Sequence, residues 1–192
     1  MRSAPAIVAM ILSFTAFAVP GVRAQQDEAA WSEVRDGAGK FDFKAPGGWR
    51  TEAWEKGGRR GVKARPPACV PFEGGLFGVE YYSDPKVSES LTSEELARIF
   101  YDYYVGQKAS AVGEAEAVQV DGASGILQRF VLEVERELDG GTVVFSLEYR
   151  VISVKKGSVA YVVNLAAESR ILEANGELCR KLVEGVRLTP DE

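Results

Sequence analysis

Few residues in this chain could carry chemistry, because its 192 residues include no histidine and only two cysteines. Without histidine, neither a Ser-His-Asp triad nor a Cys-His pair can form. Histidine-containing zinc sites are excluded for the same reason, and two cysteines cannot complete a cysteine-only zinc site. An ion with oxygen ligands, such as calcium, would need an Asp-rich loop, and the sequence has no D-x-D-x-D-G motif. We therefore expect no metal, no cofactor and no catalytic residue.

Two patterns resemble catalytic motifs but have simpler structural explanations. Ser153 and Lys156 match the S-x-x-K motif of serine–lysine nucleophiles, which requires the serine at the start of a helix. Here the serine ends a predicted strand and enters a turn, so we interpret the match as chance. Carboxylates that alternate with apolar residues on predicted strands could pair for acid–base work, but we predict that they lie on solvated strand faces. They are Asp42, Glu80, Glu133, Glu135 and Glu148.

A basic cluster stands out in a chain whose net charge is −5. It consists of Arg59, Arg60, Lys63 and Arg65, and glycines on either side predict a hairpin tip over residues 56–61. The cluster could contact an acidic partner or an anion, or it could be only a solvated turn. We group Tyr82 with it as a partner contact, because this tyrosine lies off the predicted buried faces.

Tyrosines also flank the first predicted helix, at positions 81, 82, 101, 103 and 104. Together they could line a groove for an apolar ligand or a peptide. About half of them lie on the apolar stripe that must pack on the sheet, so we expect those to belong to the core.

The first 24 residues have the pattern of a secretory signal peptide. Arg2 precedes an apolar run over residues 6–19, and small residues stand at the cleavage-site positions before Gln25. The run is shorter than the roughly 20 apolar residues of a membrane-spanning helix, and an uncleaved anchor is the alternative. We expect a secreted or periplasmic protein with no transmembrane segment after cleavage. Residues 25–40 are expected to be a flexible lead-in, and residues 41–190 a single domain.

Charge and cysteine content narrow the partners further. An acidic chain lacks the basic face that nucleic acid requires, so we exclude nucleic-acid binding. Two cysteines in an oxidising compartment permit one disulfide, between Cys69 and Cys179. Two buried free thiols are the alternative.

Hydrophobic periodicity predicts short strands, a helix, a long meander of strands and a second helix. The first strands are expected over residues 41–45, 49–55, 61–65 and 76–83. A capping box at Thr92 and Glu95 begins a helix that ends at Gly106. Four alternating strands fill residues 114–165, and the last helix spans residues 169–184. Strands segregated from helices in this way indicate an α+β fold, with helices packed on an antiparallel sheet.

This arrangement resembles the PsbP-like superfamily, which includes PsbP, a Ran-binding nuclear import factor and secreted bacterial proteins of the LpqN type. The resemblance covers residues 40–188 and rests on the opening F-x-F-x-x-P-x-x-W motif from Phe41 to Trp49, the hairpin after it, the capped helix before the meander and the amphipathic last helix. It implies an α/β/α sandwich with a central antiparallel sheet, and roles in binding or assembling other proteins. The acidic lead-in, the missing histidines and the missing anchor cysteine depart from the family, so photosystem, Ran and membrane-anchor roles do not carry over.

The sequence thus favours a secreted, non-catalytic module that binds or supports another envelope or secreted protein. A carrier of a small apolar ligand between sheet and helix is the alternative, and a hydrolase is the last choice. A pocket of about 300 Å³ or more would favour the carrier, whereas an exposed apolar or charged patch would favour the binding module.

Overall fold

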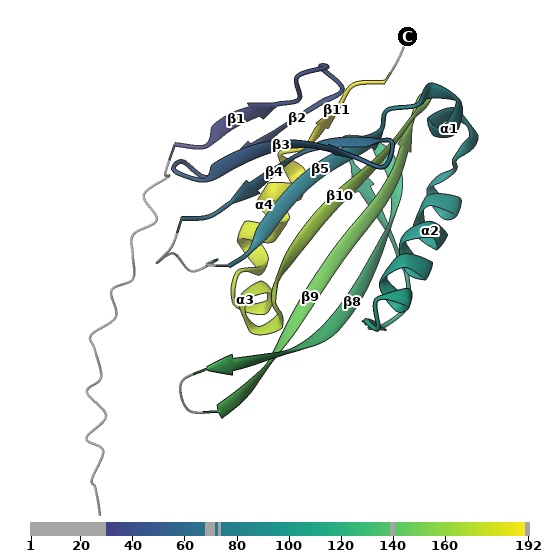
Figure 1. Ribbon diagram of the computed structural model, residues 1–192. Helices are drawn as coiled ribbons and strands as arrows, with labels where there is room; N and C mark the ends of the chain where they lie inside the picture. The colour runs from purple at the N-terminus through teal and green to yellow at the C-terminus, as the bar shows by residue number, and fades with distance from the viewer. Residues whose placement is uncertain (1–29, 68–71, 73, 139–140, 191–192) are drawn as a thin grey trace, which may run out of the picture.

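The computed structural model describes residues 30–67, 72, 74–138 and 141–190, and its centre is an eight-stranded antiparallel sheet (Figure 1). The strands are β3 (Arg50–Lys56), β4 (Arg59–Arg65), β5 (Leu76–Tyr82), β6 (Ser110–Ala111), β7 (Glu116–Val120), β8 (Ala123–Leu138), β9 (Gly141–Lys156) and β10 (Val159–Glu168). Their order across the sheet is β3-β4-β5-β10-β9-β8-β6, and β7 also pairs with β8. Two-residue turns with positive φ, Gly57-Gly58 and Asp121-Gly122, close the β3–β4 and β7–β8 hairpins, as the twist of antiparallel strands favours.

A second, three-stranded sheet joins the two ends of the described chain. It consists of β1 (Ser32–Arg35), β2 (Phe41–Ala45) and β11 (Arg187–Leu188), in the order β1-β2-β11. The expectation of a flexible lead-in over residues 25–40 is therefore wrong for β1. Val34 pairs opposite Phe43 and packs against the core, and this contact holds an otherwise polar segment in place.

The described residues also form four helices: α1 (Pro85–Ser90), α2 (Ser93–Gly106), α3 (Ser169–Ala174) and α4 (Gly176–Glu184). The predicted capping box is confirmed, since Thr92 Oγ1 accepts the Glu95 N–H at 3.1 Å and Glu95 accepts the Thr92 N–H at 2.8 Å. The prediction of a single helix over residues 169–184 is wrong, because the helix is interrupted at Asn175. The Asn175 side chain donates to the Ile171 carbonyl at 2.8 Å and so satisfies an acceptor at the end of α3.

The helices lie on both faces of the large sheet, as the predicted α/β/α sandwich requires (Figure 1). α2 packs on β8 and β9, while α3 packs on β9 and β10 and α4 packs on β2. The larger core lies on the α3–α4 side and contains Phe41 and Phe43, both buried. The Phe43 ring meets that of Phe77 edge-on at 5.0 Å. Trp49 stacks on Phe72 at 5.7 Å at the margin of this core, so the opening motif is structural.

Two of the carboxylates predicted on solvated strand faces are in fact buried, Glu80 and Glu148. Glu148 accepts hydrogen bonds from Arg129 Nε at 3.0 Å and Arg150 Nε at 2.8 Å. Burial alone would raise the pKa of Glu148, but the two guanidinium groups outweigh it and hold that pKa below its ordinary value. The arginines on neighbouring strand positions thus make burial of this charge possible.

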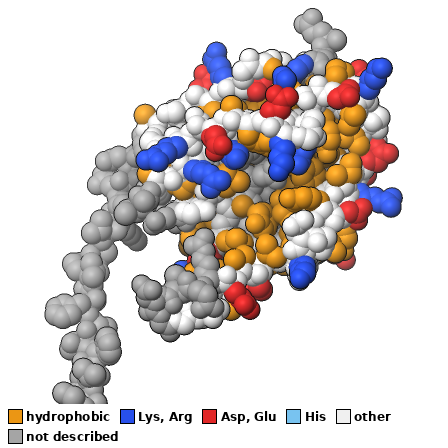
Figure 2. Space-filling view, in the orientation of Figure 1, with side chains coloured by type: hydrophobic (Ala, Val, Ile, Leu, Met, Phe, Trp, Pro, Cys, Tyr) orange, Lys and Arg blue, Asp and Glu red, His pale blue; other side chains and the backbone are white. Residues whose placement is uncertain are grey.

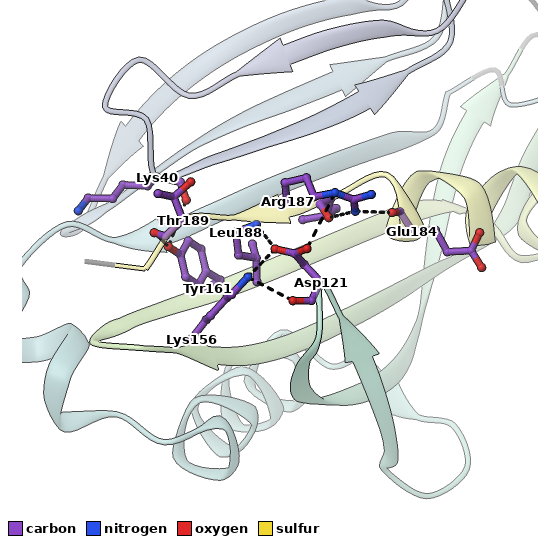
Figure 3. Close-up of polar contacts among 9 residues, drawn as sticks. Lys40, Asp121, Lys156, Tyr161, Glu184, Arg187, Leu188 and Thr189 are labelled. Atoms are coloured by element: carbon purple, nitrogen blue, oxygen red, sulfur yellow. Dashed lines mark hydrogen bonds and ion pairs between the residues drawn. The ribbon is translucent and has the colours of Figure 1, made fainter. Parts of the chain in front are cut away.

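A polar cluster fastens the C-terminal strand to the large sheet (Figure 3). Asp121 Oδ2 accepts from Lys156 Nζ at 2.5 Å and from the Leu188 N–H at 2.9 Å. Burial opposes ionisation of Asp121, but these donors prevail and lower its pKa. Tyr161 reaches the same strand from β10, with its hydroxyl 2.5 Å from the Thr189 carbonyl. The β7–β8 turn therefore holds β11, and through β11 the small sheet.

Candidate functional site

The face of the large sheet that carries α2 is only partly covered by helices. α2 packs on β8 and β9, and α1 packs on β5 and β10. Beside them a groove of about 290 Å³ opens over β3, β4, β5 and β10. Its lining includes Trp54, Lys63, Arg65, Leu76, Tyr104 and Tyr149. Figure 2 shows hydrophobic side chains gathered over α2 and the neighbouring sheet, with Lys and Arg side chains along the upper side of this area.

A partly buried ion pair contributes to the groove floor through Glu80. Arg59 Nη1 lies 2.8 Å from Glu80 Oε1, and the two side chains are 28% and 5% exposed. The Arg59 guanidinium also lies 5.8 Å from the Trp54 ring centroid and 5.3 Å from that of Phe100. Both distances are within the range of cation–π attraction. Arg59 therefore joins β3, β5 and α2 at one point.

The environment of Glu80 disfavours its charge in spite of the arginine. Burial raises the pKa of Glu80, and the charge and hydrogen bonds of Arg59 and Asn164 offset this only in part. Asn164 Oδ1 is buried and has no hydrogen-bond partner among the described residues. A buried carboxyl group whose pKa is raised, placed in a groove, is typical of functional sites.

Stacked aromatic rings form the wall of the groove on the side of α2. The Tyr104 ring stacks on Phe130 at 4.7 Å and tilts against Tyr149 at 4.9 Å. Burial raises the pKa of Tyr104 well above its ordinary value, so its hydroxyl stays protonated and can donate a hydrogen bond. Because the three rings come from α2, β8 and β9, the wall is fixed by the core beneath it.

Basic side chains gather at the outer end of the groove, and too few acidic side chains of the described residues lie near enough to neutralise them. Arg50 on β3 pairs directly opposite Arg65 on β4, and both side chains are exposed. No acidic side chain of the described residues forms an ion pair with either arginine, while Lys63 lies 3.7 Å from Glu52. Like charges directly opposite each other destabilise a strand pair. An anion bound between Arg50 and Arg65 would remove this repulsion.

Searches of protein-family models and curated proteins give no match to this chain. Among solved structures, cyanobacterial PsbP (CyanoP) of Synechocystis sp. PCC 6803 aligns with a TM-score of 0.55 at 16% identity, over 84% of this chain and 94% of that one. The fold is PsbP-like.

Two other solved structures align with this chain at lower TM-scores. The Ran-binding protein Mog1p of Saccharomyces cerevisiae aligns with a TM-score of 0.49 at 10% identity, over 83% of this chain and 96% of that one. LpqN of Mycobacterium tuberculosis, involved in cell envelope biogenesis, aligns with a TM-score of 0.38 at 14% identity, over 83% of this chain and 91% of that one.

On the PsbP-like sheet, the predicted basic cluster divides between two faces. The hairpin tip is only Gly57-Gly58, so the prediction that Arg59 and Arg60 lie in a turn is wrong. Because side chains alternate along β4, Arg59, Lys63 and Arg65 share the groove face. Arg60 lies on the opposite side, 3.0 Å from Glu55.

The remaining residues singled out in the sequence lie in different parts of the fold. Tyr82 lies half-buried on the groove face, against the core beneath α2. Cys179 is buried, but Cys69 lies outside the described residues, so the disulfide stays a prediction. The S-x-x-K pair is not a site, because alternation along β9 places Ser153 and Lys156 on opposite faces.

Sequence reasoning missed most of the groove lining. Trp54, Tyr149 and Asn164 received no role, although the alternation of β3 already placed Trp54 on the face of Arg50. Within the described ranges, no group of acidic and cysteine side chains is arranged to hold a metal ion. Every helix in these ranges is too short or too polar to span a bilayer.

Proposed function

We propose that this chain is a non-catalytic module that binds another protein on the open face of its sheet. The observation that carries the proposal is the groove, where a fixed aromatic wall adjoins two arginines, Arg50 and Arg65, that form no ion pair with an acidic side chain of the described residues. Aromatic side chains and arginine supply most of the binding energy in protein interfaces. The partner segment would place apolar side chains against Tyr104 and Tyr149, and a carboxylate between Arg50 and Arg65.

A small apolar ligand is the second candidate for this groove. Its volume of about 290 Å³ lies at the lower limit of ligand pockets, which enclose roughly 300–1,000 Å³. A small ligand here would remain partly exposed, because the groove is open along the sheet. A segment of a protein would cover the groove from above and bury both surfaces, which favours the binding module.

Catalysis is not part of the proposal. Glu80 is a carboxylate whose pKa is raised in a groove, which is the usual mark of a general acid. However, its carboxylate is only 5% exposed and is held by Arg59 at 2.8 Å. We infer that the pair shapes the floor of the binding site and takes no part in a reaction.

The proposed place of action is outside the cytoplasmic membrane, with an envelope or secreted protein as partner. This rests on the signal-peptide pattern of residues 1–24, which lie outside the described part of the chain. Mass spectrometry of the protein from the native envelope fraction tests it. The mass of a chain that begins at Gln25 would support export, and a chain with an intact N-terminus in the cytoplasmic fraction would contradict it.

Affinity capture from the envelope fraction tests the binding site. It compares the wild type with two variants that change the net charge by the same amount. In the groove variant, Arg50 and Arg65 are both replaced by Glu. In the control variant, the exposed Arg60 and Arg98, which lie off the groove, are replaced by Glu. We expect the wild type and the control to recover the same protein and the groove variant to lose it. Recovery by all three, or a co-purifying lipid with no protein, contradicts the proposal.

A further inference from the structure

The lining of the groove includes a glycine in the middle of a strand, Gly78 on β5. Its neighbours Phe77 and Val79 are buried in the core on the α3–α4 side, so alternation along β5 directs position 78 into the groove. Glycine in the interior of a strand has no side chain to pack and weakens the strand, and it often marks a place that a ligand approaches closely. The first question is therefore whether the fold itself requires this glycine.

A second glycine on the groove face, Gly61 on β4, is one that the fold does require. A Cβ atom at Gly61 would lie 2.5 Å from the Val79 carbonyl oxygen and 2.8 Å from Glu80 Cβ, so a side chain cannot fit there. A Cβ atom at Gly78 would meet nothing closer than the Val62 carbonyl oxygen at 3.4 Å, which is an ordinary contact. Neither glycine has a positive φ. Gly61 thus serves the packing of the strands, whereas Gly78 leaves room for a side chain that this chain does not supply.

The side chains opposite Gly78 on the two adjacent strands make their contacts elsewhere. Lys63 on β4 and Asn164 on β10 both pair with Gly78 in the sheet. Lys63 Nζ lies 3.7 Å from Glu52 on β3, and the Asn164 side chain donates a hydrogen bond to Glu80. The hollow above Gly78 therefore remains part of the groove.

This hollow has an aromatic wall on one side and a positively charged end on the other. The rings of Tyr104 and Tyr149 line it on the side of α2. On β4, Arg65 comes two residues after the position that pairs with Gly78, and Arg50 lies opposite Arg65. The space between the two arginines is thus two residues along the sheet and one and a half strands across it from the glycine, about 10 Å away.

We propose that the partner binds as an extended segment that inserts one apolar side chain above Gly78 and places an acidic side chain between Arg50 and Arg65. This inference rests on the proposed function and specifies the segment that the groove accepts. The apolar side chain fills the hollow against the tyrosine rings, as anchor residues of protein interfaces do. The acidic side chain complements the two arginines, which fixes the direction of the segment along the groove.

The dimensions of the groove favour an extended segment over a helix. An α-helix with its side chains is about 10–12 Å wide, whereas the groove encloses only about 290 Å³. Side chains on the same side of a strand are about 7 Å apart at a separation of two residues, and those of a polyproline-type segment are about 9 Å apart at a separation of three. The acidic residue should therefore lie two or three positions from the anchor.

Replacement of Gly78 tests whether the fold needs this glycine. Because the added Cβ atom meets only ordinary contacts, Gly78→Ala should raise the melting temperature by about 1–4 °C. Gly78→Val should also fold, since β-branched residues favour strands. Gly176→Ala is the control, at a glycine of α4 with nothing within 4 Å on the opposite face of the sheet. A Gly78→Ala variant that melts below the wild type contradicts the inference.

Selection from a phage-displayed library of random linear peptides supplies a probe for the groove. We expect the wild type to enrich peptides that share an apolar residue with Asp or Glu two or three positions away. In fluorescence anisotropy, Gly78→Val should bind these peptides at least about tenfold more weakly, and Gly176→Ala should bind them as the wild type does. Absence of enrichment, enriched peptides without an acidic residue, or equal binding by Gly78→Val each overturns the inference. If valine prevents folding, unchanged binding by Gly78→Ala overturns it.

The variant with Glu at Arg50 and Arg65 separates this inference from the proposed function. A captured protein that the arginine variant loses and Gly78→Val keeps would support the binding module but overturn the anchor above Gly78. A captured protein that both variants keep would contradict the two proposals together.

Discussion

Replacement of Arg59 by Met tests the ion pair on the groove floor. Methionine keeps an unbranched stem between Trp54 and Phe100 but removes the charge that faces Glu80 at 2.8 Å. An ionised carboxylate that is only 5% exposed would then have no cation beside it, which is strongly unfavourable. The least costly response is for Glu80 to bind a proton in the folded state.

This response sets an upper limit on the electrostatic part of the loss of stability. Glutamate ordinarily titrates near about 4.3, and each unit of pH corresponds to about 1.4 kcal/mol. Keeping Glu80 protonated therefore costs at most about 3.7 kcal/mol at pH 7 and about 1 kcal/mol at pH 5. The electrostatic loss lies below this limit, since burial already raises the pKa of Glu80 in the wild type. Loss of the cation–π contacts adds a part that does not depend on pH.

The sign of the pH dependence follows from proton binding. In the variant, the folded state binds a proton on Glu80 that the unfolded state has released, so stability falls as pH rises. Urea unfolding at pH 5, 6 and 7 should show the difference between wild type and Arg59→Met growing by up to about 1.4 kcal/mol per unit. Arg60→Met is the control, since its ion pair with Glu55 is exposed to solvent and should contribute little to stability. Equal losses for Arg59→Met at pH 5 and pH 7 would refute the reasoning.

Three further substitutions probe the fold. Asp121→Asn should cost about 1.5–3 kcal/mol at neutral pH by weakening charge-assisted bonds from Lys156 and the β11 backbone. Because the pKa of Asp121 is lowered on folding, this loss should shrink as pH falls below about 4, and urea midpoints that differ equally at all pH values would contradict it. Phe43→Ala should cost about 3–5 kcal/mol in urea unfolding, since the ring is fully buried, and a loss under about 1 kcal/mol would contradict its place in the core. Thr92→Ala should cost about 1 kcal/mol and lower the melting temperature, and an unchanged melting temperature would argue against the capping box.

The parts of the fold that the sequence predicts are those whose signals are local. The alternation of Phe41 and Phe43 and the capping box at Thr92 each involve neighbours in the chain, and strand β2 and helix α2 lie where those signals place them. The break at Asn175 was missed because the apolar pattern of residues 169–184 continues through it. A pattern of side chains does not report the backbone conformation at a single residue.

Burial of charge and the groove could not be predicted, because both depend on how separate segments meet. Alternation on β5 marks Glu80 as polar, but only the register of β4 beside β5 brings Arg59 to it. The predicted stripe of α2 also included Ile99 and Tyr103, which are exposed. The sheet meets the helix along a narrower line through Leu96, Phe100 and Tyr104. The uncovered strip beside that line is the groove.

The ion pair itself favours a binding role for the groove, and one further variant tests this. Well-packed apolar residues often replace a buried ion pair at no loss, or with a gain of about 1–4 kcal/mol. The double variant Arg59→Met with Glu80→Leu should therefore be more stable than Arg59→Met alone, and its stability should no longer change between pH 5 and 7 relative to wild type. If the fold does not need the Arg59–Glu80 pair, the position of the pair at the groove indicates that it serves the binding of the ligand. The double variant should then fold normally but lose the captured partner, and a double variant clearly less stable than the wild type would show that the pair serves the fold.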